Sequence, residues 1–170
     1  KKLFFLYDKN LVFLKKNDIK KILSKIDFIE SVEIKKIYPD KIIIKIFEET
    51  PILVLQNRKK KFYLNKKINL INSADLENFK NLPIVFGDKE NFKIFYANLK
   101  KIDFPLEIIT RYYLFESKRW DLEIDQKKII KLPVENYVKS LKNFMSFRKQ
   151  VNYNKYKIFD YRINNQLILK

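Results

Sequence analysis

The chain has 170 residues and carries 37 Lys and Arg against 20 Asp and Glu, which gives a formal net charge of +17. Its length allows one ordinary domain or two small ones, and a hydrophobic fraction of 46% indicates a folded protein despite the charge. The absence of Cys and His excludes disulfides, thiol catalysis, thiolate metal sites and the usual general base. A single Gly excludes the glycine-rich phosphate-binding loops.

The excess of basic over acidic residues is compatible with a nucleic-acid or membrane-surface partner, since the isoelectric point is near 9.8. However, 32 of the basic residues are Lys and only five are Arg, the residue suited to base readout and phosphate forks. Lys, Ile, Asn, Phe and Tyr all have A/T-rich codons. A codon bias therefore explains the composition, and a solvated lysine surface is the favoured interpretation.

Hydropathy gives no membrane span, because no stretch approaches 18 consecutive apolar residues. We expect no signal peptide either, since charge returns at Asp8 and Lys9 soon after the apolar start. The first residue is Lys rather than Met, so any upstream targeting segment would lie outside this sequence.

The first 50 residues predict the order helix, helix, strand, strand. The run Leu3–Tyr7 is expected to end a helix, and Asn17 is expected to cap a second helix that reaches about Ile26. Alternation around residues 32–35 predicts a strand, and residues 42–47 predict a second strand that pairs with it in antiparallel orientation. The turn between them is Tyr38-Pro39-Asp40-Lys41.

Pro51 interrupts the strand pattern and marks the expected boundary between a domain at residues 1–50 and a second at 51–170. The second part predicts a mostly antiparallel sheet with two packed helices, so the whole chain is expected to be α+β. The expected helices are 91–102 and 134–149, and the expected strands are 52–55, 62–64, 68–71, 107–115, 120–124, 129–132, 157–161 and 166–169.

Few side chains suggest catalysis or ligand binding. Asp121, Glu123 and Asp125 alternate along one predicted strand and its turn, and such carboxylates can bind Ca²⁺ or Mg²⁺. A solvated strand face is favoured, because no second ligand cluster is evident. The basic run 58–61 could contact phosphates but is more typical of a solvated loop. The placed aromatic residues fall on inward faces, which indicates a core rather than a base-stacking platform.

Several motifs in this order resemble the FtsQ/DivIB family of cell-division proteins. Residues 29–51 resemble the end of a POTRA domain, with two strands around the "YPD" turn of Tyr38, Pro39 and Asp40 and then "EETP". Further along the chain, residues 82–87 resemble "LP-x-x-x-G", 119–122 with 130–133 resemble "RW-x-L … LP", and 159–162 resemble "DLR".

The resemblance implies a partial POTRA module (ααββ) without its first strand, followed by an FtsQ-type β domain. It also implies a non-enzymatic divisome scaffold outside the cytoplasmic (inner) membrane, in the periplasm, anchored by a single upstream transmembrane helix that is not in this sequence. The implied partners are FtsB- and FtsL-like proteins, with other divisome proteins at the POTRA domain. No cofactor, metal, catalytic residue or nucleic acid is implied.

The family's partner contact would lie on the last strand, where a partner segment adds to the sheet edge by β-augmentation. Carried onto this chain, the contact residues are Ile163, Asn165, Gln166, Leu167, Ile168 and Leu169, and Lys118 or Arg119 is the basic residue that contributes near the "RW" strand. For Leu167 and Leu169, plain core packing is an equally weighted alternative.

Two other functions remain open from the sequence. A POTRA module of another outer-envelope secretion or assembly system would share residues 1–50 but not the later motifs. A basic nucleic-acid binder is motivated only by the net charge, and it predicts tight binding with a steep salt dependence.

Overall fold

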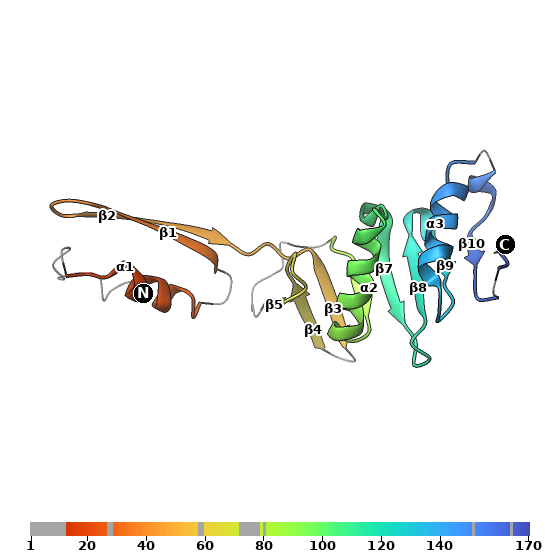
Figure 1. The fold of residues 1–170 in the computed structure, drawn as a ribbon, viewed down its shortest axis with the longest axis horizontal. Coiled ribbons are helices and arrows are strands. Elements are labelled where there is room, and N and C mark those ends of the chain that lie inside the picture. Colours follow the sequence, from red (N-terminus) through yellow and green to blue (C-terminus); the bar gives the residue numbers. More distant parts are fainter. Residues whose placement is uncertain are drawn as a thin grey trace. The chain divides into compact units, whose positions relative to one another are not determined.

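The computed structural model describes residues 13–26, 29–57, 60–71, 79, 81–150, 152–163 and 165–170. The chain divides into two compact units, residues 1–50 with 71–76 and residues 51–70 with 77–170. Figure 1 labels most of their helices and strands. Among the described residues, no helix is long and apolar enough to cross a membrane.

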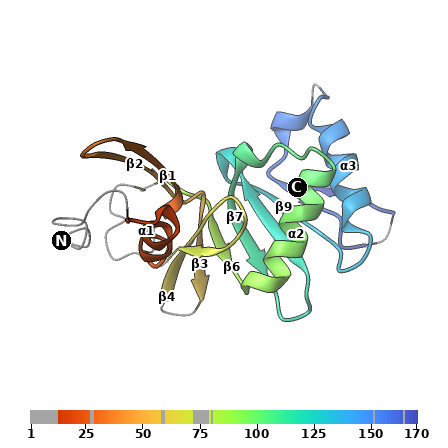
Figure 2. The ribbon, with the colours of Figure 1, turned by 60° about the vertical axis from the view of Figure 1, so that its left-hand side comes forward.

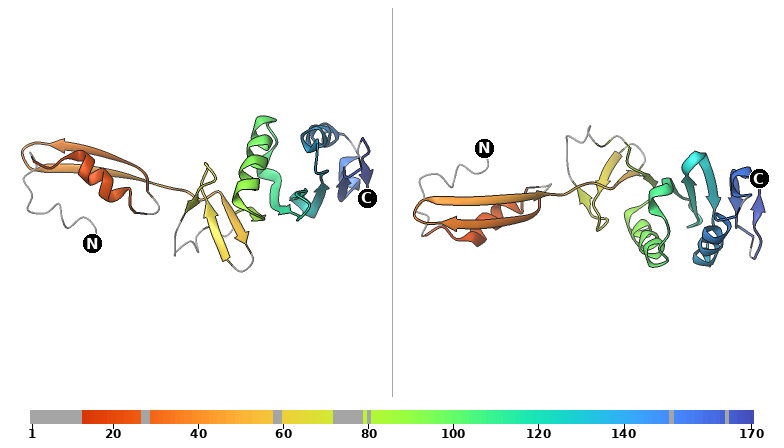
Figure 3. Two further views of the ribbon diagram at one scale, coloured as in Figure 1. Left: turned by 60° about the horizontal axis from the view of Figure 1, so that its bottom comes forward. Right: turned by 90° about the horizontal axis from the view of Figure 1, so that it is seen from above.

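The first unit is a long β-hairpin with a helix on one face. Strands β1 (Ile29–Ile37) and β2 (Lys41–Glu48) pair in antiparallel orientation, and helix α1 (Lys16–Leu23) packs on them (Figure 3). Period-two alternation directs one side of each strand toward α1. The resulting small core contains Leu14, Ile19 and Leu23 with the partly buried Ile26, Ile29, Val32, Ile34, Ile42 and Ile44.

The helix that was predicted to start at Asn17 differs from the structure at both of its ends. Helix α1 begins at Lys16 after Lys15, so Asn17 lies within the first turn and is not the cap, and the helix ends at Leu23 rather than Ile26. Lys15 has extended backbone and no capping side chain, so the start is set by packing of the apolar face and not by a cap. The expected helix at 3–7 lies outside the described residues.

The second unit is a nine-stranded sheet with α2 (Lys89–Lys101) and α3 (Tyr137–Phe147) on the same face (Figure 2). The spatial order is β11-β10-β9-β8-β7-β6-β3-β4-β5. The strands are β3 (Leu53–Asn57), β4 (Lys60–Leu64), β5 (Leu70–Ile71), β6 (Ile84–Phe86), β7 (Ile109–Leu114), β8 (Trp120–Ile124), β9 (Lys128–Lys131), β10 (Ile158–Asp160) and β11 (Ile168–Leu169).

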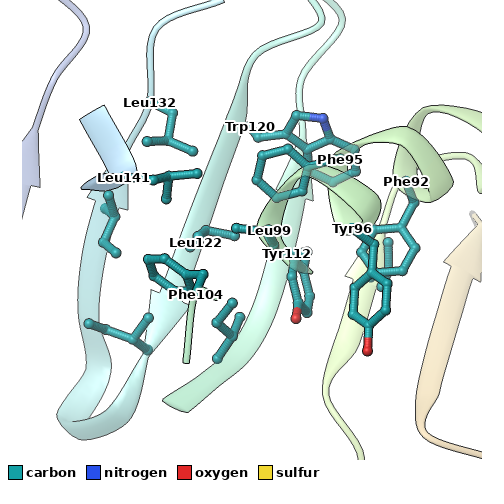
Figure 4. Close-up of a cluster of buried hydrophobic side chains, with 14 of the residues drawn as sticks. Phe92, Phe95, Tyr96, Leu99, Phe104, Tyr112, Trp120, Leu122, Leu132 and Leu141 are labelled. Atoms are coloured by element: carbon teal, nitrogen blue, oxygen red, sulfur yellow. The ribbon is translucent and has the colours of Figure 1, made fainter. Parts of the chain in front are cut away.

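Helix α2 shows how sequence pattern becomes packing. Asp88 caps it, since its carboxylate accepts a hydrogen bond from the Asn91 backbone N–H at 2.9 Å. The side chains at the next helical repeats are aromatic or aliphatic and face the sheet, and they are Phe92, Phe95, Tyr96 and Leu99. In the core, the Trp120 ring stacks on Phe95 with centroids 4.7 Å apart (Figure 4). The aromatic residues expected on the inward faces of the two helices form this core, whereas Phe47 and Phe115 of the expected strands are exposed.

The expected fold class, α+β with a mostly antiparallel sheet and two packed helices, is confirmed. One strand was missed: β6 lies parallel to both β3 and β7. It has only three residues, and its apolar run Ile84–Phe86 lacks the alternation that predicts a strand, because it is an interior strand of the sheet. The strand expected from Glu107 instead begins with a 3-10 turn at Leu106–Ile108.

Candidate partner-binding edge

Strand β11 forms one edge of the nine-stranded sheet. It pairs with β10 in antiparallel orientation, with Phe159 opposite Leu169 and Asp160 opposite Ile168. On its other side, no strand among the described residues pairs with it. An edge of this kind presents a row of backbone donors and acceptors to a partner.

The direction of those backbone groups follows from the ladder. Lys170 and Ile158 exchange both hydrogen bonds, with N···O distances of 3.1 and 2.9 Å. Because the pattern alternates along an antiparallel pair, the N–H and C=O of Ile168 also face β10. Those of Leu169 therefore point away from the sheet, where an added strand would bond them, and the same alternation continued one step before β11 would direct those of Leu167 the same way.

The side chains along this edge divide by face. Leu167 and Leu169 are partly buried and pack against the core, so the core-packing alternative describes their side chains. Ile168 lies on the opposite face and is 37% exposed, and Ile163 in the preceding loop is 52% exposed. Two roles are thus compatible at one residue, since Leu167 can pack inward while its backbone faces outward.

A pocket of about 480 Å³ lies between α3 and the loop before β11. Its α3 wall consists of polar residues at helical spacing, namely Asn136, Lys139, Ser140 and Asn143. Ile163, Asn165, Gln166 and Leu167 form the opposite side. Lys139 Nζ donates to Asn165 Oδ1 at 3.1 Å, and Tyr161 Oη donates to Asn143 Oδ1 at 3.0 Å. The pocket brings four of the predicted contact residues together beside one lysine.

Sequence reasoning missed the α3 wall of this pocket. A signal was present, because residues 136, 139, 140 and 143 follow the i, i+3, i+4, i+7 pattern of one helix face. That stripe is polar, however, and polar stripes usually face solvent. Only the tertiary fold places it against the loop that follows Tyr161.

Lys118 and Arg119 lie in the hairpin turn between β7 and β8. The register carries this turn to the same end of the sheet as the loop 161–167, because Asp121 pairs with Lys131 and Lys131 with Asp160. Arg119 is already engaged: Nε lies 3.2 Å from Asp121 Oδ1, and the guanidinium lies 4.2 Å from the Phe115 ring centroid. Lys118 is exposed and is thus the more accessible of the two cations.

The "DLR"-like motif forms a second internal ion pair. Arg162 Nη2 lies 2.6 Å from Asp160 Oδ2, and Nε lies 2.8 Å from Oδ1, a two-point contact. Hydrogen bonding from Arg162 lowers the pKa of Asp160. By contrast, burial raises the pKa of Asp121, and Arg119 only partly opposes that effect.

The acidic residues of β8 do not form a metal centre, and no metal-binding group of acidic residues exists within the described ranges. Asp121 is bound by Arg119, and Glu123 accepts a two-point contact from Arg111 Nη1 at 2.7 and 2.9 Å. The favoured expectation of a solvated strand face was wrong for Asp121, which is only 5% exposed, whereas Asp125 is exposed. Neighbouring arginines cover this part of the face.

The turn of Tyr38, Pro39 and Asp40 lies at the tip of the β1–β2 hairpin, and the Tyr38 side chain is 62% exposed. The Tyr38–Pro39 peptide bond is cis. The basic run 58–61 lies partly outside the described residues.

Comparison with known protein families identifies the class of the first domain. The family model "POTRA domain, FtsQ-type" matches residues 2–49, which contain the described hairpin and α1. The extracytoplasmic domain of the cell division protein DivIB from Geobacillus stearothermophilus aligns with a TM-score of 0.40 at 11% identity, over 64% of this chain and 98% of that one.

The curated relatives extend the similarity beyond the POTRA part. Cell division protein FtsQ of Rickettsia typhi is 29% identical over 165 residues, covering 92% of this chain and 60% of that protein. The FtsQ of Methylomonas methanica is 24% identical over 132 residues, covering 73% and 52%. The chain therefore spans a little over half the length of these relatives. Residues 2–49 thus match the FtsQ-type POTRA model, and most of the chain is similar to FtsQ cell division proteins.

Proposed function

We propose that this chain is a non-enzymatic, extracytoplasmic part of a divisome scaffold that binds FtsB- and FtsL-like proteins through the edge of β11. The observation that carries the proposal is the edge position of β11, whose ladder directs the backbone groups of Leu169 away from β10. A partner segment in extended conformation would form main-chain hydrogen bonds there, and its side chains would select the partner. In this proposal, backbone groups at the edge of the sheet bind the partner, and no reactive side chain is needed.

The proposal includes the wider context of the family. A transmembrane helix upstream would anchor the chain in the inner membrane, and residues 1–50 would form the POTRA domain that contacts other divisome proteins. Residues 51–170 would form the partner-binding domain. Together these parts support assembly of the septum.

The pocket beside β11 supports a side-chain contribution to binding. Leu167 lines the pocket and immediately precedes β11, so a strand added at this edge passes its rim. Among the described residues that line the pocket, Lys139 is the only charged one, and its hydrogen bond goes to a neutral amide. An acidic partner side chain would fit that charge.

The experiment compares two substitutions at one position. Leu167→Pro removes the outward N–H and the core-facing side chain together, whereas Leu167→Ala removes the side chain alone. Affinity for purified FtsB/FtsL ectodomains should fall much further for Leu167→Pro than for Leu167→Ala. Equal losses, or no binding by the unmodified chain, would argue against edge pairing.

The alternatives have less support. An outer-envelope POTRA module would share only the first 50 residues, but the FtsQ relatives align over as much as 92% of the chain. The support for nucleic acid is weaker, because most aromatic side chains of the second unit pack in its core and Arg119 and Arg162 are paired within the chain.

A further inference from the structure

The β1–β2 hairpin has a second face, which points away from α1. The residues directed at α1 are Val32, Ile34, Ile42 and Ile44, so their neighbours along each strand point to the other side. The register places four pairs on that far face, namely Ser31–Phe47, Glu33–Lys45, Lys35–Ile43 and Ile37–Lys41. We call these eight residues the ribbon face.

The ribbon face exposes large apolar side chains. Ile37 is 38% exposed, Ile43 is 39% exposed and Phe47 is 43% exposed, and Tyr38 at the adjoining turn is 62% exposed. Single exposed apolar residues are ordinary on a protein surface, but these share one side of a two-stranded ribbon, with Ile37, Ile43 and Tyr38 near the turn and Phe47 at the open end. This face is therefore not the usual polar side of a half-buried sheet.

Lysines alternate with the apolar side chains on the same face. Lys35 lies directly opposite Ile43, and Lys41 lies directly opposite Ile37, so each cation stands beside an apolar neighbour. Lys45 faces Glu33, which offsets one charge. Residues 35–45 together hold four lysines and one aspartate, so the distal half of the hairpin is cationic.

We propose that the ribbon face and the turn at Tyr38 bind an anionic lipid surface. Lysine stems can lie along the apolar side chains while their ammonium groups reach headgroup phosphates. Tyr has an apolar ring and a polar hydroxyl, which suits the level of the headgroups. An alternating cation–apolar surface fits a layer that offers negative charge above hydrocarbon. This property goes beyond the divisome function and does not depend on it.

The test uses vesicles of phosphatidylglycerol and phosphatidylcholine, with phosphatidylcholine alone for comparison. The intact chain should bind the anionic vesicles and not the neutral ones, with affinity that falls as salt rises. Lys35→Glu with Lys41→Glu should weaken that binding by about thirtyfold or more. Binding to the β11 partner should stay unchanged, which separates this property from the proposed function.

Matched controls separate a site from general attraction by a chain of charge +17. Lys93→Glu with Lys101→Glu, on exposed positions of α2, makes the same change in net charge. Tyr38→Ser with Ile43→Ser tests the apolar part, and Ile94→Ser is its control, because Ile94 is 64% exposed on α2. Equal losses from ribbon and control variants, or equal binding to neutral vesicles, would overturn the proposal.

Discussion

Asp121 and Asp160 are equally buried, each 5% exposed, yet the pKa values of their carboxyl groups move in opposite directions. Two causes explain the difference: desolvation is the largest effect at Asp121, whereas hydrogen bonding from Arg162 is the largest at Asp160. Arg162 bonds Asp160 at 2.6 and 2.8 Å, whereas Arg119 reaches Asp121 only at 3.2 and 3.4 Å. The shorter two-point contact outweighs a weaker desolvation at Asp160, whereas the longer contact does not outweigh the stronger desolvation at Asp121.

The lowered pKa of Asp160 predicts how the free energy of unfolding depends on pH. A depressed pKa means that Asp160 stabilises the fold above its unfolded pKa, and this contribution is lost as the pH falls through the folded pKa. We expect Asp160→Asn to lower the free energy of unfolding by about 1–3 kcal/mol at neutral pH, with the difference shrinking in acid. Urea unfolding at several pH values measures it.

Asp121→Asn is the contrasting variant. Its raised pKa means that the ionised carboxylate costs stability, and protonation as the pH falls relieves that cost. The stability difference between the unmodified chain and Asp121→Asn should therefore move in the opposite direction on acidification. The same pH trend for both variants would contradict the assignment of hydrogen bonding to one and desolvation to the other.

At the scale of elements, strands and helices with clear periodicity could be predicted from the sequence. Strand β8 is found at the expected residues 120–124, and α2 lies close to its expected range. Strand β6 and the early end of α1 could not be predicted, because parallel pairing and tertiary packing decide them. The pocket could not be predicted either, since its walls are more than 15 residues apart in sequence.

The single glycine, Gly87, lies after β6 where two elements approach closely. A Cβ at this position would lie 2.8 Å from Leu114 Cβ and 3.5 Å from the Trp120 ring. Leu114 Cβ is close to the backbone and cannot rotate away, so we expect Gly87→Ala to cost about 1–3 kcal/mol. Thermal melting measures this. Ser117→Ala in the exposed β7–β8 turn is the control and should melt like the unmodified chain.

Lys139 on α3 gives a prediction about partner binding at the pocket. If Lys139 receives an acidic partner side chain, Lys139→Met should weaken partner binding and reduce its salt dependence. Lys142→Met is the matched control, since Lys142 is an exposed lysine of the same helix that does not line the pocket. Titration at two salt concentrations distinguishes them. An equal effect of both variants would indicate general electrostatics.

At the scale of the whole molecule, the division into two units predicts that the second unit folds without the first. The second unit has its own large aromatic core, and every described residue of that core lies within residues 51–170. We expect a fragment of residues 51–170 to fold cooperatively and to keep its affinity for the β11 partner. Calorimetry and the same titration check this. A fragment without a cooperative transition would show that the core depends on residues 1–50.

The most direct test of the central claim is amide hydrogen exchange at β11 with and without the FtsB/FtsL ectodomains. Edge pairing predicts that the N–H groups of Leu167 and Leu169 become protected when the partner binds. Those of Ile168 and Lys170 should change little, because they already face β10. Complex formation without added protection at Leu167 and Leu169 would contradict the account.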